Sequence, residues 1–248
     1  MQLKNSVAVV TGAGKGLGKA IAEELFKEGA LLALFDIQYD LIDDLAKKLD
    51  SSGNNIIAIK ADVTNEKEIK NAMEQVFNRF RKIDILINNA GVSAHKPTKE
   101  MSVEDFNKVI NVNLNGTFIC SKSVITYMEK QKKGKIVNIA SLGGRTGRPG
   151  VGVNYAASKA GVIGLTQTLA RELGPSGICV NSISPGPILT EQTKQYSKEA
   201  FASWNVGRAI QKDGLPEDVA QAVVFLSSGK SDWITGISLD VNGGILIR

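Results

Sequence analysis

The chain has 248 residues, of which 43% are hydrophobic and 22% are charged, and its formal net charge is +5. This composition excludes intrinsic disorder and collagen-like repeats, and two cysteines are too few for a disulfide scaffold. Because the 30 basic and 25 acidic residues are interspersed and no apolar run approaches the roughly 20 residues needed to cross a bilayer, we expect no nucleic-acid partner and no membrane partner.

Short β-branched runs alternate with longer segments of helical periodicity along almost the whole chain. In chain order, the runs predict strands at 6–11, 31–35, 55–60, 83–88, 135–140, 178–184 and 237–241. The intervening segments predict a helix from about residue 16 and further helices at 39–49, 66–81, 103–130, 154–173, 197–204 and 216–225. Such alternation implies a parallel sheet with helices on both faces, and no linker divides it, so we expect one domain over residues 1–248.

Local signals add detail to this outline. Asn65 with Glu68, and Ser102 with Asp105, have the spacing of helix-start signatures. Cys120 and Cys179 have apolar neighbours, so we expect buried free thiols and no bound metal. The first residues lead directly into a strand and lack the apolar region of a signal peptide, so we expect a cytoplasmic protein.

A glycine-rich loop joins the first predicted strand to the first helix, with the sequence Thr11-Gly12-Ala13-Gly14-Lys15-Gly16-Leu17-Gly18. Glycine lets the backbone approach a ligand closely, and the start of the helix offers unpaired N–H groups to a pyrophosphate. A tight turn alone would need one or two glycines, whereas four alternate with other residues here. The loop therefore predicts a nucleotide site.

Asp36 ends the second predicted strand, shortly before a helix. A carboxylate there can accept hydrogen bonds from the ribose hydroxyls of NAD, and it repels the 2′-phosphate of NADP. Capping of the next helix is the alternative explanation for this acid, and Lys15 in the glycine loop would favour a 2′-phosphate. We expect NAD(H) as the favoured cofactor and NADP(H) as the alternative.

Four motifs follow one another along the chain, namely Thr11-Gly12-x-x-x-Gly16-x-Gly18, Asn88-Asn89-Ala90-Gly91, Tyr155-x-x-x-Lys159 and Pro185-Gly186. In their order and spacing, and over its whole length, the chain resembles the short-chain dehydrogenases/reductases. The resemblance implies an α/β, single-domain Rossmann fold with a doubly wound seven-stranded parallel sheet in the order 3-2-1-4-5-6-7. It also implies hydride transfer between NAD(H) or NADP(H) and an alcohol/carbonyl pair, the reaction of an NAD(P)-dependent short-chain alcohol dehydrogenase or ketoreductase.

The resemblance also assigns roles to residues of this sequence. The implied catalytic residues are Asn113, Ser141, Tyr155 and Lys159. Asn111 takes the place of Asn113 if the family motif aligns two residues earlier. With the glycine loop and Asp36, the expected cofactor site comprises Gly12, Lys15, Gly16, Leu17, Gly18, Asp36, Asp62, Val63, Asn88, Asn89, Ala90, Gly91, Tyr155, Lys159, Pro185, Gly186, Ile188 and Thr190.

Tyr155 and Lys159 are four residues apart, which places both side chains on one face of a helix. Reduction of a ketone needs a proton donor with a pKa near working pH, and free tyrosine titrates near about 10. We expect the Lys159 ammonium, together with the positive nicotinamide ring, to lower the pKa of Tyr155, which then acts as general acid/base. Ser141 would bind the substrate oxygen, and Asn113 would hold a water that relays protons from Lys159.

The substrate is expected between the loop 142–154 and a lid at about 186–213. Candidate contacts are His95, Leu142, Gly143, Arg145, Arg148 and residues 188–204. Many similar proteins are 3-oxoacyl-acyl-carrier-protein reductases, which usually favour NADPH and carry basic residues before the fifth and sixth strands. Lys132 and Lys133 supply positive charge before the fifth strand, but residues 175–177, before the sixth strand, include no basic residue. We therefore rank a general secondary alcohol or ketone first, and an acyl-carrier reductase of fatty acid synthesis as the alternative.

The helix that carries Tyr155 is rich in small residues, namely Ala156, Ala157, Ala160, Gly161 and Gly164. A surface of small side chains permits close approach by another helix. With the helix before it, this surface resembles one interface of the family, and 216–241 resembles a second. We expect a homotetramer with three perpendicular two-fold axes.

Overall fold

The computed structural model describes residues 1–148, 150–191, 193–195 and 197–247. Within these ranges, seven parallel strands form one sheet in the order β3-β2-β1-β4-β5-β6-β7, which confirms the fold that the resemblance implies. The strands are β1 (Val7–Thr11), β2 (Leu31–Asp36), β3 (Ile56–Lys60), β4 (Ile85–Asn88), β5 (Gly134–Ile139), β6 (Ile178–Pro185) and β7 (Ser238–Val241). The chain order reverses between β1 and β4, and ligands of such sheets bind beside this point, at the carboxyl ends of the strands.

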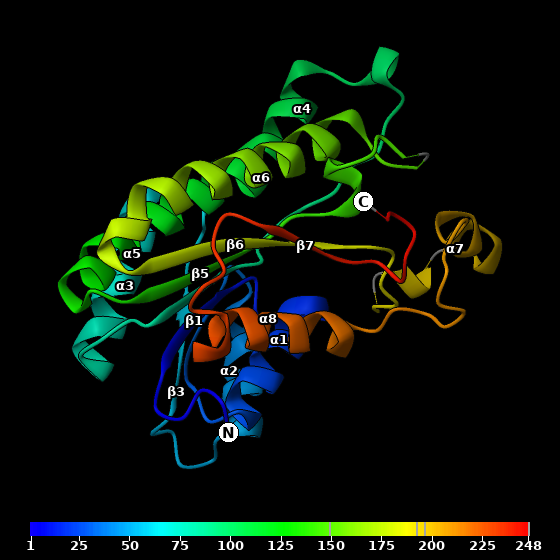
Figure 1. Cartoon of the computed structure of the whole chain (residues 1–248). Helices are drawn as coiled ribbons and strands as arrows, with labels where there is room; N and C mark the ends of the chain where they lie inside the picture. Colours follow the sequence, from blue (N-terminus) through cyan, green and yellow to red (C-terminus); the bar gives the residue numbers. More distant parts are fainter. Residues whose placement is uncertain (149, 192, 196, 248) are drawn as a thin grey trace.

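Helices cover both faces of the sheet (Figure 1). One face packs on α1 (Gly16–Lys27), α2 (Tyr39–Leu49) and α8 (Pro216–Ser227). The other packs on α3 (Glu66–Phe80), α5 (Gly116–Gln131) and α6 (Val153–Leu173), with α4 (Val103–Ile110) against α6. Short helical turns lie at Thr98–Glu100, Leu142–Gly144, Gly174–Ser176, Thr193–Gln195 and Gly229–Ser231. Each helix within the described residues is too short or too polar to span a bilayer.

The central strands are apolar along their whole length because neighbouring residues of a strand point to opposite faces of the sheet, and helices bury both faces. In β1, Ala8 and Val10 belong to the core under α1 and α8, while Val7 and Val9 belong to the core under α3, α5 and α6. All four side chains are fully buried. This is why the strand reads as a continuous apolar run and not as an alternating one.

The segment predicted as one helix over 103–130 is interrupted by a π-helical turn at Asn111–Asn115, between α4 and α5. Inside this turn the Asn113 side chain is fully buried, and the Thr117 hydroxyl donates to the Asn113 carbonyl at 2.8 Å. Single π-turns inside helices mark functional sites in many proteins. Hydrophobic periodicity predicts the helix but not this turn, because the turn depends on side-chain hydrogen bonds to distant segments.

Both predicted helix-start signatures are present. The Asn65 side chain accepts from the N–H groups of Lys67 and Glu68 at the start of α3. At the start of α4, Ser102 and Asp105 form a reciprocal capping box. These local contacts fix where the two helices begin, as expected for such caps.

The segment after β6 leaves the sheet and returns to nearly the same place. Ile188 forms an isolated bridge with Gly214, and the Leu189 N–H donates to the Gly214 carbonyl at 2.8 Å. Between these points α7 (Lys198–Trp204) projects from the body of the molecule (Figure 1). Residues 192 and 196 of the predicted lid, and residue 149 of the loop 142–154, lie outside the described residues.

Candidate active site

The glycine loop and the Asn88–Gly91 motif form one hydrogen-bonded unit. The Thr11 hydroxyl oxygen accepts the N–H groups of Asn89, at 3.1 Å, and Ala90, at 3.0 Å. In return, Asn89 Nδ2 donates to the carbonyls of Thr11 and Gly12, each at 3.0 Å. These contacts fix the carboxyl end of β1 against the carboxyl end of β4, at the reversal point of the sheet.

Contacts with the neighbouring backbone explain two of the loop glycines. A Cβ on Gly18 would overlap the Gly12 carbonyl oxygen, and a Cβ on Gly12 would lie 2.8 Å from Ala90 Cα. Gly16 differs: its φ is +55°, and no described atom lies within 4 Å of the place of a Cβ. Because α1 begins there without a side-chain cap from the described residues, no such cap occupies the N–H groups of its first turn. This arrangement fits a pyrophosphate.

Asp36 reaches this loop from the end of β2. Its Oδ2 accepts the Gly14 N–H at 2.9 Å, and its Oδ1 accepts the Gln38 N–H at 3.0 Å. A carboxylate has about four lone-pair sites, so both oxygens can still accept from ribose hydroxyls. Lys15, by contrast, has an exposed side chain at the start of α1.

Two further predicted cofactor residues follow β3. Asp62 Oδ1 accepts from the Thr64 N–H and hydroxyl, at 2.9 and 2.8 Å. Val63 is buried, and a Cβ on Gly116 would lie 2.7 Å from its Cγ2. The structure thus places these residues just after the carboxyl end of β3, whose last residue pairs with Asp36.

Ser141, Tyr155 and Lys159 come together beyond the carboxyl end of β5. The Ser141 hydroxyl oxygen accepts the Gly143 N–H at 3.0 Å, at the start of the turn after the strand. Lys159 Nζ donates to the Ile139 carbonyl at 2.6 Å and lies 5.8 Å from the centroid of the Tyr155 ring. Tyr155 and Lys159 therefore share one face of α6, as their spacing predicts.

Burial dominates the titration of this pair. It lowers the pKa of Lys159 to about 8, and it raises the pKa of Tyr155 above the usual value, a shift that a hydrogen bond with Ser141 opposes. The expected lowering of the Tyr155 pKa is therefore not present in the chain by itself. The physical reason is the burial of the phenol, which disfavours its charged form more than the hydrogen bond with Ser141 favours it.

Asn113 links the Asn88–Gly91 side of the site to α6. Its Oδ1 accepts the Val92 N–H at 2.8 Å, and its Nδ2 donates to the Val92 carbonyl and the Ser158 hydroxyl, both at 3.0 Å. The Ser158 hydroxyl donates in turn to the Tyr155 carbonyl at 2.8 Å. Both amide hydrogens of Asn113 are thus bonded within the protein, and these bonds position α6.

Several supporting groups had no assignment from the sequence. Ser158, the Ile139 carbonyl and the Thr11 hydroxyl each bind a residue of the predicted site. Gly144 is another, because a Cβ there would lie 2.6 Å from the backbone of Lys159. Thr11 stands inside a recognised motif and could have been found, whereas nothing in the sequence marks Ser158 or Ile139.

The residues after β6 border the site from the other side. A Cβ on Gly186 would lie 2.9 Å from Asn242 Cα, so the chain turns closely past β7. Ile188 lines a cavity of about 570 Å³ that extends to Asn242. The Thr190 N–H donates to the Thr193 hydroxyl at 2.7 Å, and the Thr190 hydroxyl oxygen accepts the Thr193 N–H at 3.2 Å. The Thr190 hydroxyl is therefore engaged in its own turn.

The two arginines considered as substrate contacts bind the protein itself. Arg145 forms an ion pair with Asp240 at 3.5 Å, and Arg148 Nη2 donates to the Trp204 carbonyl at 2.7 Å. Arg148 thus ties the loop after Ser141 to the end of α7. Among the other candidates, Leu142 and Gly143 are buried and His95 is exposed.

Comparisons with known proteins show which sequences this chain resembles. The family model described as enoyl-(acyl carrier protein) reductase matches residues 12–246. A 3-oxoacyl-[acyl-carrier-protein] reductase of Thermotoga maritima is 39% identical over the full length of both chains, and one of Aquifex aeolicus is 37% identical over 99% of both.

Solved structures agree as well. The crystal structure of gox2181 has a TM-score of 0.94 at 31% identity, covering 98% of this chain and 96% of that one. A putative gluconate dehydrogenase from Agrobacterium tumefaciens has a TM-score of 0.94 at 32% identity, covering 100% of this chain and 98% of that one. With its motifs, sheet order and site geometry, the chain belongs to the short-chain dehydrogenase/reductase family.

Proposed function

We propose that the protein reduces the keto group of a 3-oxoacyl thioester carried by acyl carrier protein, with a nicotinamide cofactor as hydride donor. The observation that carries the proposal is the meeting of Ser141, Tyr155 and Lys159 beyond β5, beside the open glycine loop. Support for the substrate class comes from the full-length relatives, which are named for this reaction. Exposed Lys132 and Lys133 offer positive charge to an acidic carrier.

Each residue of the catalytic set has a defined task in this reaction. The bound cofactor supplies the hydride. Ser141 donates a hydrogen bond to the substrate oxygen as negative charge develops on it. Tyr155 gives its proton to the same oxygen, and the Lys159 ammonium stabilises the phenolate that remains. Asn113 holds α6, and with it Tyr155, in place through Ser158.

A second candidate is an NAD-dependent dehydrogenase of a small secondary alcohol. It is favoured by Asp36, whose carboxylate lies over the glycine loop and opposes a 2′-phosphate. The structural neighbour named as a putative gluconate dehydrogenase supports such a substrate class.

Turnover on two substrate classes separates the candidates. We expect NAD(P)H consumption with acetoacetyl-acyl carrier protein to exceed that with simple ketones and secondary alcohols. Exchange of Lys132 and Lys133 for glutamate should raise KM for the carrier-bound substrate and leave KM for the free thioester unchanged. Activity confined to small alcohols, with no response to the carrier, would support the second candidate.

The cofactor preference rests on Asp36, and we propose NAD(H) over NADP(H). In Asp36→Ala we expect the ratio of NADH to NADPH affinity to fall by roughly 10- to 100-fold, because charge-assisted hydrogen bonds are lost and a repulsive charge is removed. Fluorescence titration with each reduced cofactor measures this ratio. Asp36→Asn is the matched control, since it removes the charge but keeps an acceptor for the Gly14 N–H. An unchanged ratio in both variants would refute the assignment.

We propose a cytoplasmic homotetramer, with 186–213 as the substrate lid. Trp233 is fully exposed, and Ile237 and Phe225 are 40% and 37% exposed, all within the 216–241 segment. Phe118 on α5 is 47% exposed, and α6 presents Gly164 to open space. Association would bury these apolar surfaces.

A further inference from the structure

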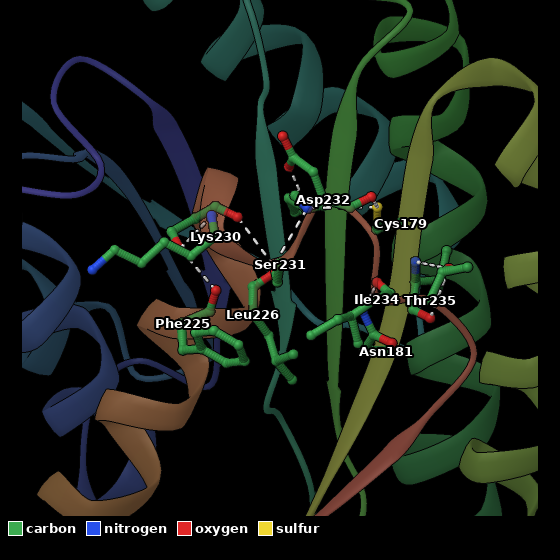
Figure 2. A network of polar contacts seen from close by, with 12 residues as sticks. Cys179, Asn181, Phe225, Leu226, Lys230, Ser231, Asp232, Ile234 and Thr235 are labelled. Carbon is green, nitrogen blue, oxygen red and sulfur yellow. Dashed lines mark hydrogen bonds and ion pairs between the residues drawn. The ribbon is translucent and has the colours of Figure 1, made fainter.

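A cluster of polar side chains lies at the amino ends of β5 and β6, at the opposite edge of the sheet from Ser141. Lys135 and Cys179 are register partners on these neighbouring strands. Lys135 Nζ lies 3.5 Å from Cys179 Sγ and 2.8 Å from Asp232 Oδ1. Figure 2 shows Cys179, Ser231 and Asp232 gathered at this edge. A primary amine and a thiol are therefore held in direct contact.

The exposure of the cluster is uneven. Lys135 is only 4% exposed, which is rare for lysine, whereas Cys179 is partly exposed and Asp232 is mostly exposed. The prediction of two buried thiols is thus confirmed for Cys120 and wrong for Cys179, because β6 begins near the rim of the sheet. A small oxidant can approach Cys179, while the Lys135 amine behind it is fixed.

Several contacts hold this geometry, and the thiol makes one of them, since Cys179 Sγ donates to the Asp232 carbonyl at 3.6 Å. Asn181 Nδ2 donates to the Ile234 carbonyl at 2.8 Å, and the Val180 N–H donates to the Thr235 hydroxyl at 3.0 Å. These bonds tie the segment before β7 to β6, as Figure 2 shows. Ser231 Oγ lies 3.4 Å from Lys135 Nζ and so ties the same segment to β5. The contact between amine and thiol adds to these bonds.

We propose that Cys179 and Lys135 form a reversible nitrogen–sulfur cross-link when the protein meets a peroxide. Hydrogen peroxide first oxidises the Cys179 thiol by two electrons to a sulfenic acid, and one water is released. The Lys135 ammonium first gives one proton to Asp232, and the freed amine nitrogen attacks the sulfur while the S–O bond breaks. The leaving hydroxide takes a second proton from the nitrogen and departs as water, and the proton on Asp232 passes to solvent. A thiol reductant reverses the link and restores both side chains.

Proximity favours this outcome over competing fates of the oxidised sulfur. A separation of 3.5 Å is within reach of a near-attack geometry, and neighbouring strands hold the pair in register. The other cysteine of the chain, Cys120, is buried on α5, and burial raises its pKa to about 12, so it is a poor partner for a disulfide. The link would join β5 and β6, whose opposite ends lead to Ser141 and to Pro185–Gly186.

Mass spectrometry of the full-length protein tests the proposal. After treatment with hydrogen peroxide and digestion without reductant, we expect one cross-linked species that joins the peptides of Lys135 and Cys179. Its mass is the sum of the two peptides less two hydrogen atoms, and dithiothreitol separates them. The species should be absent in Cys179→Ser and in Lys135→Arg, and present in Cys120→Ser. Lys135→Arg keeps a cation beside Asp232, which protects the fold.

A second measurement keeps the test independent of variant stability. Dimedone, which traps sulfenic acid, should label Cys179 roughly tenfold more in Lys135→Arg than in the wild type, because the competing amine is gone. The proposal is overturned if Cys179 of the oxidised wild type carries a sulfinic acid, or remains a free thiol, while Lys135 is unmodified. Equal dimedone labelling of both proteins would overturn it as well.

Discussion

Replacement of Tyr155 by phenylalanine is expected to lower kcat by roughly 10³-fold, within the range of general acid–base catalysis. In the proposed reaction the proton donor is this phenol, which forms a hydrogen bond with Ser141 and has Lys159 Nζ 5.8 Å from its ring centroid. Phenylalanine keeps the ring and its place on α6 and removes only the hydroxyl. Thermal unfolding and NADH binding should therefore stay near wild-type values while turnover is lost. Steady-state kinetics with titration of NADH measures both.

The pH profile provides an independent check of the same assignment. Reduction needs a protonated Tyr155 beside a charged Lys159, and the pKa of Lys159 is about 8. Reduction is therefore expected to decline as pH rises through about 8, because the amine loses the charge that stabilises the product phenolate. Oxidation of an alcohol needs the phenolate, and because the pKa of Tyr155 is raised above its usual value, its rate should rise only at higher pH. Retained turnover in Tyr155→Phe, or identical profiles in both directions, would contradict the mechanism.

Introduction of a single methyl group into the glycine loop is expected to weaken nucleotide binding strongly. In Gly18→Ala the new Cβ would overlap the Gly12 carbonyl oxygen and lie 2.5 Å from Asn89 Nδ2. Both neighbours are held by hydrogen bonds, so the loop itself must move. We expect NADH affinity to fall by roughly 100-fold and the free energy of unfolding to fall by about 1–3 kcal/mol, the usual cost of overpacking.

The matched control for this variant is Gly147→Ala. No described atom lies within 4 Å of the place of a Cβ on Gly147, and its φ is not in the left-handed region. Its free energy of unfolding should change by less than about 0.5 kcal/mol. Calorimetry and NADH titration on both variants separate a local collision from a general effect of alanine. Normal NADH binding by Gly18→Ala would show that the loop does not hold the cofactor.

Much of the fold follows from patterns that act over short distances. The apolar runs predict β1 to β7 because both faces of the sheet are buried, and the cap at Asn65 fixes the start of α3. The strand order came from the resemblance and not from periodicity. The π-turn at Asn111–Asn115 was missed because it depends on Val92 and Ser158, which are 21 and 45 residues from Asn113.

In the candidate site, too, the sequence predicts contacts between residues that are close in the chain and misses those between distant ones. The spacing of Tyr155 and Lys159 predicts a shared helix face, because one helical turn separates them. It does not predict their pKa shifts, which depend on how much protein surrounds each group. Nor does it show that Arg145 and Arg148 are occupied, since their partners Asp240 and Trp204 are distant in sequence.

The pairing of Ile188 with Gly214 has a consequence for exchange between relatives. Because the two ends of the intervening segment are bonded to each other, its length and sequence can vary without pulling on β6 or on α8. Natural divergence can therefore change the substrate-side residues of this segment while β6 and α8 stay in place. A segment transplanted from a family member of different substrate preference should confer new selectivity provided that it keeps its bonds to Arg148 and Gly243.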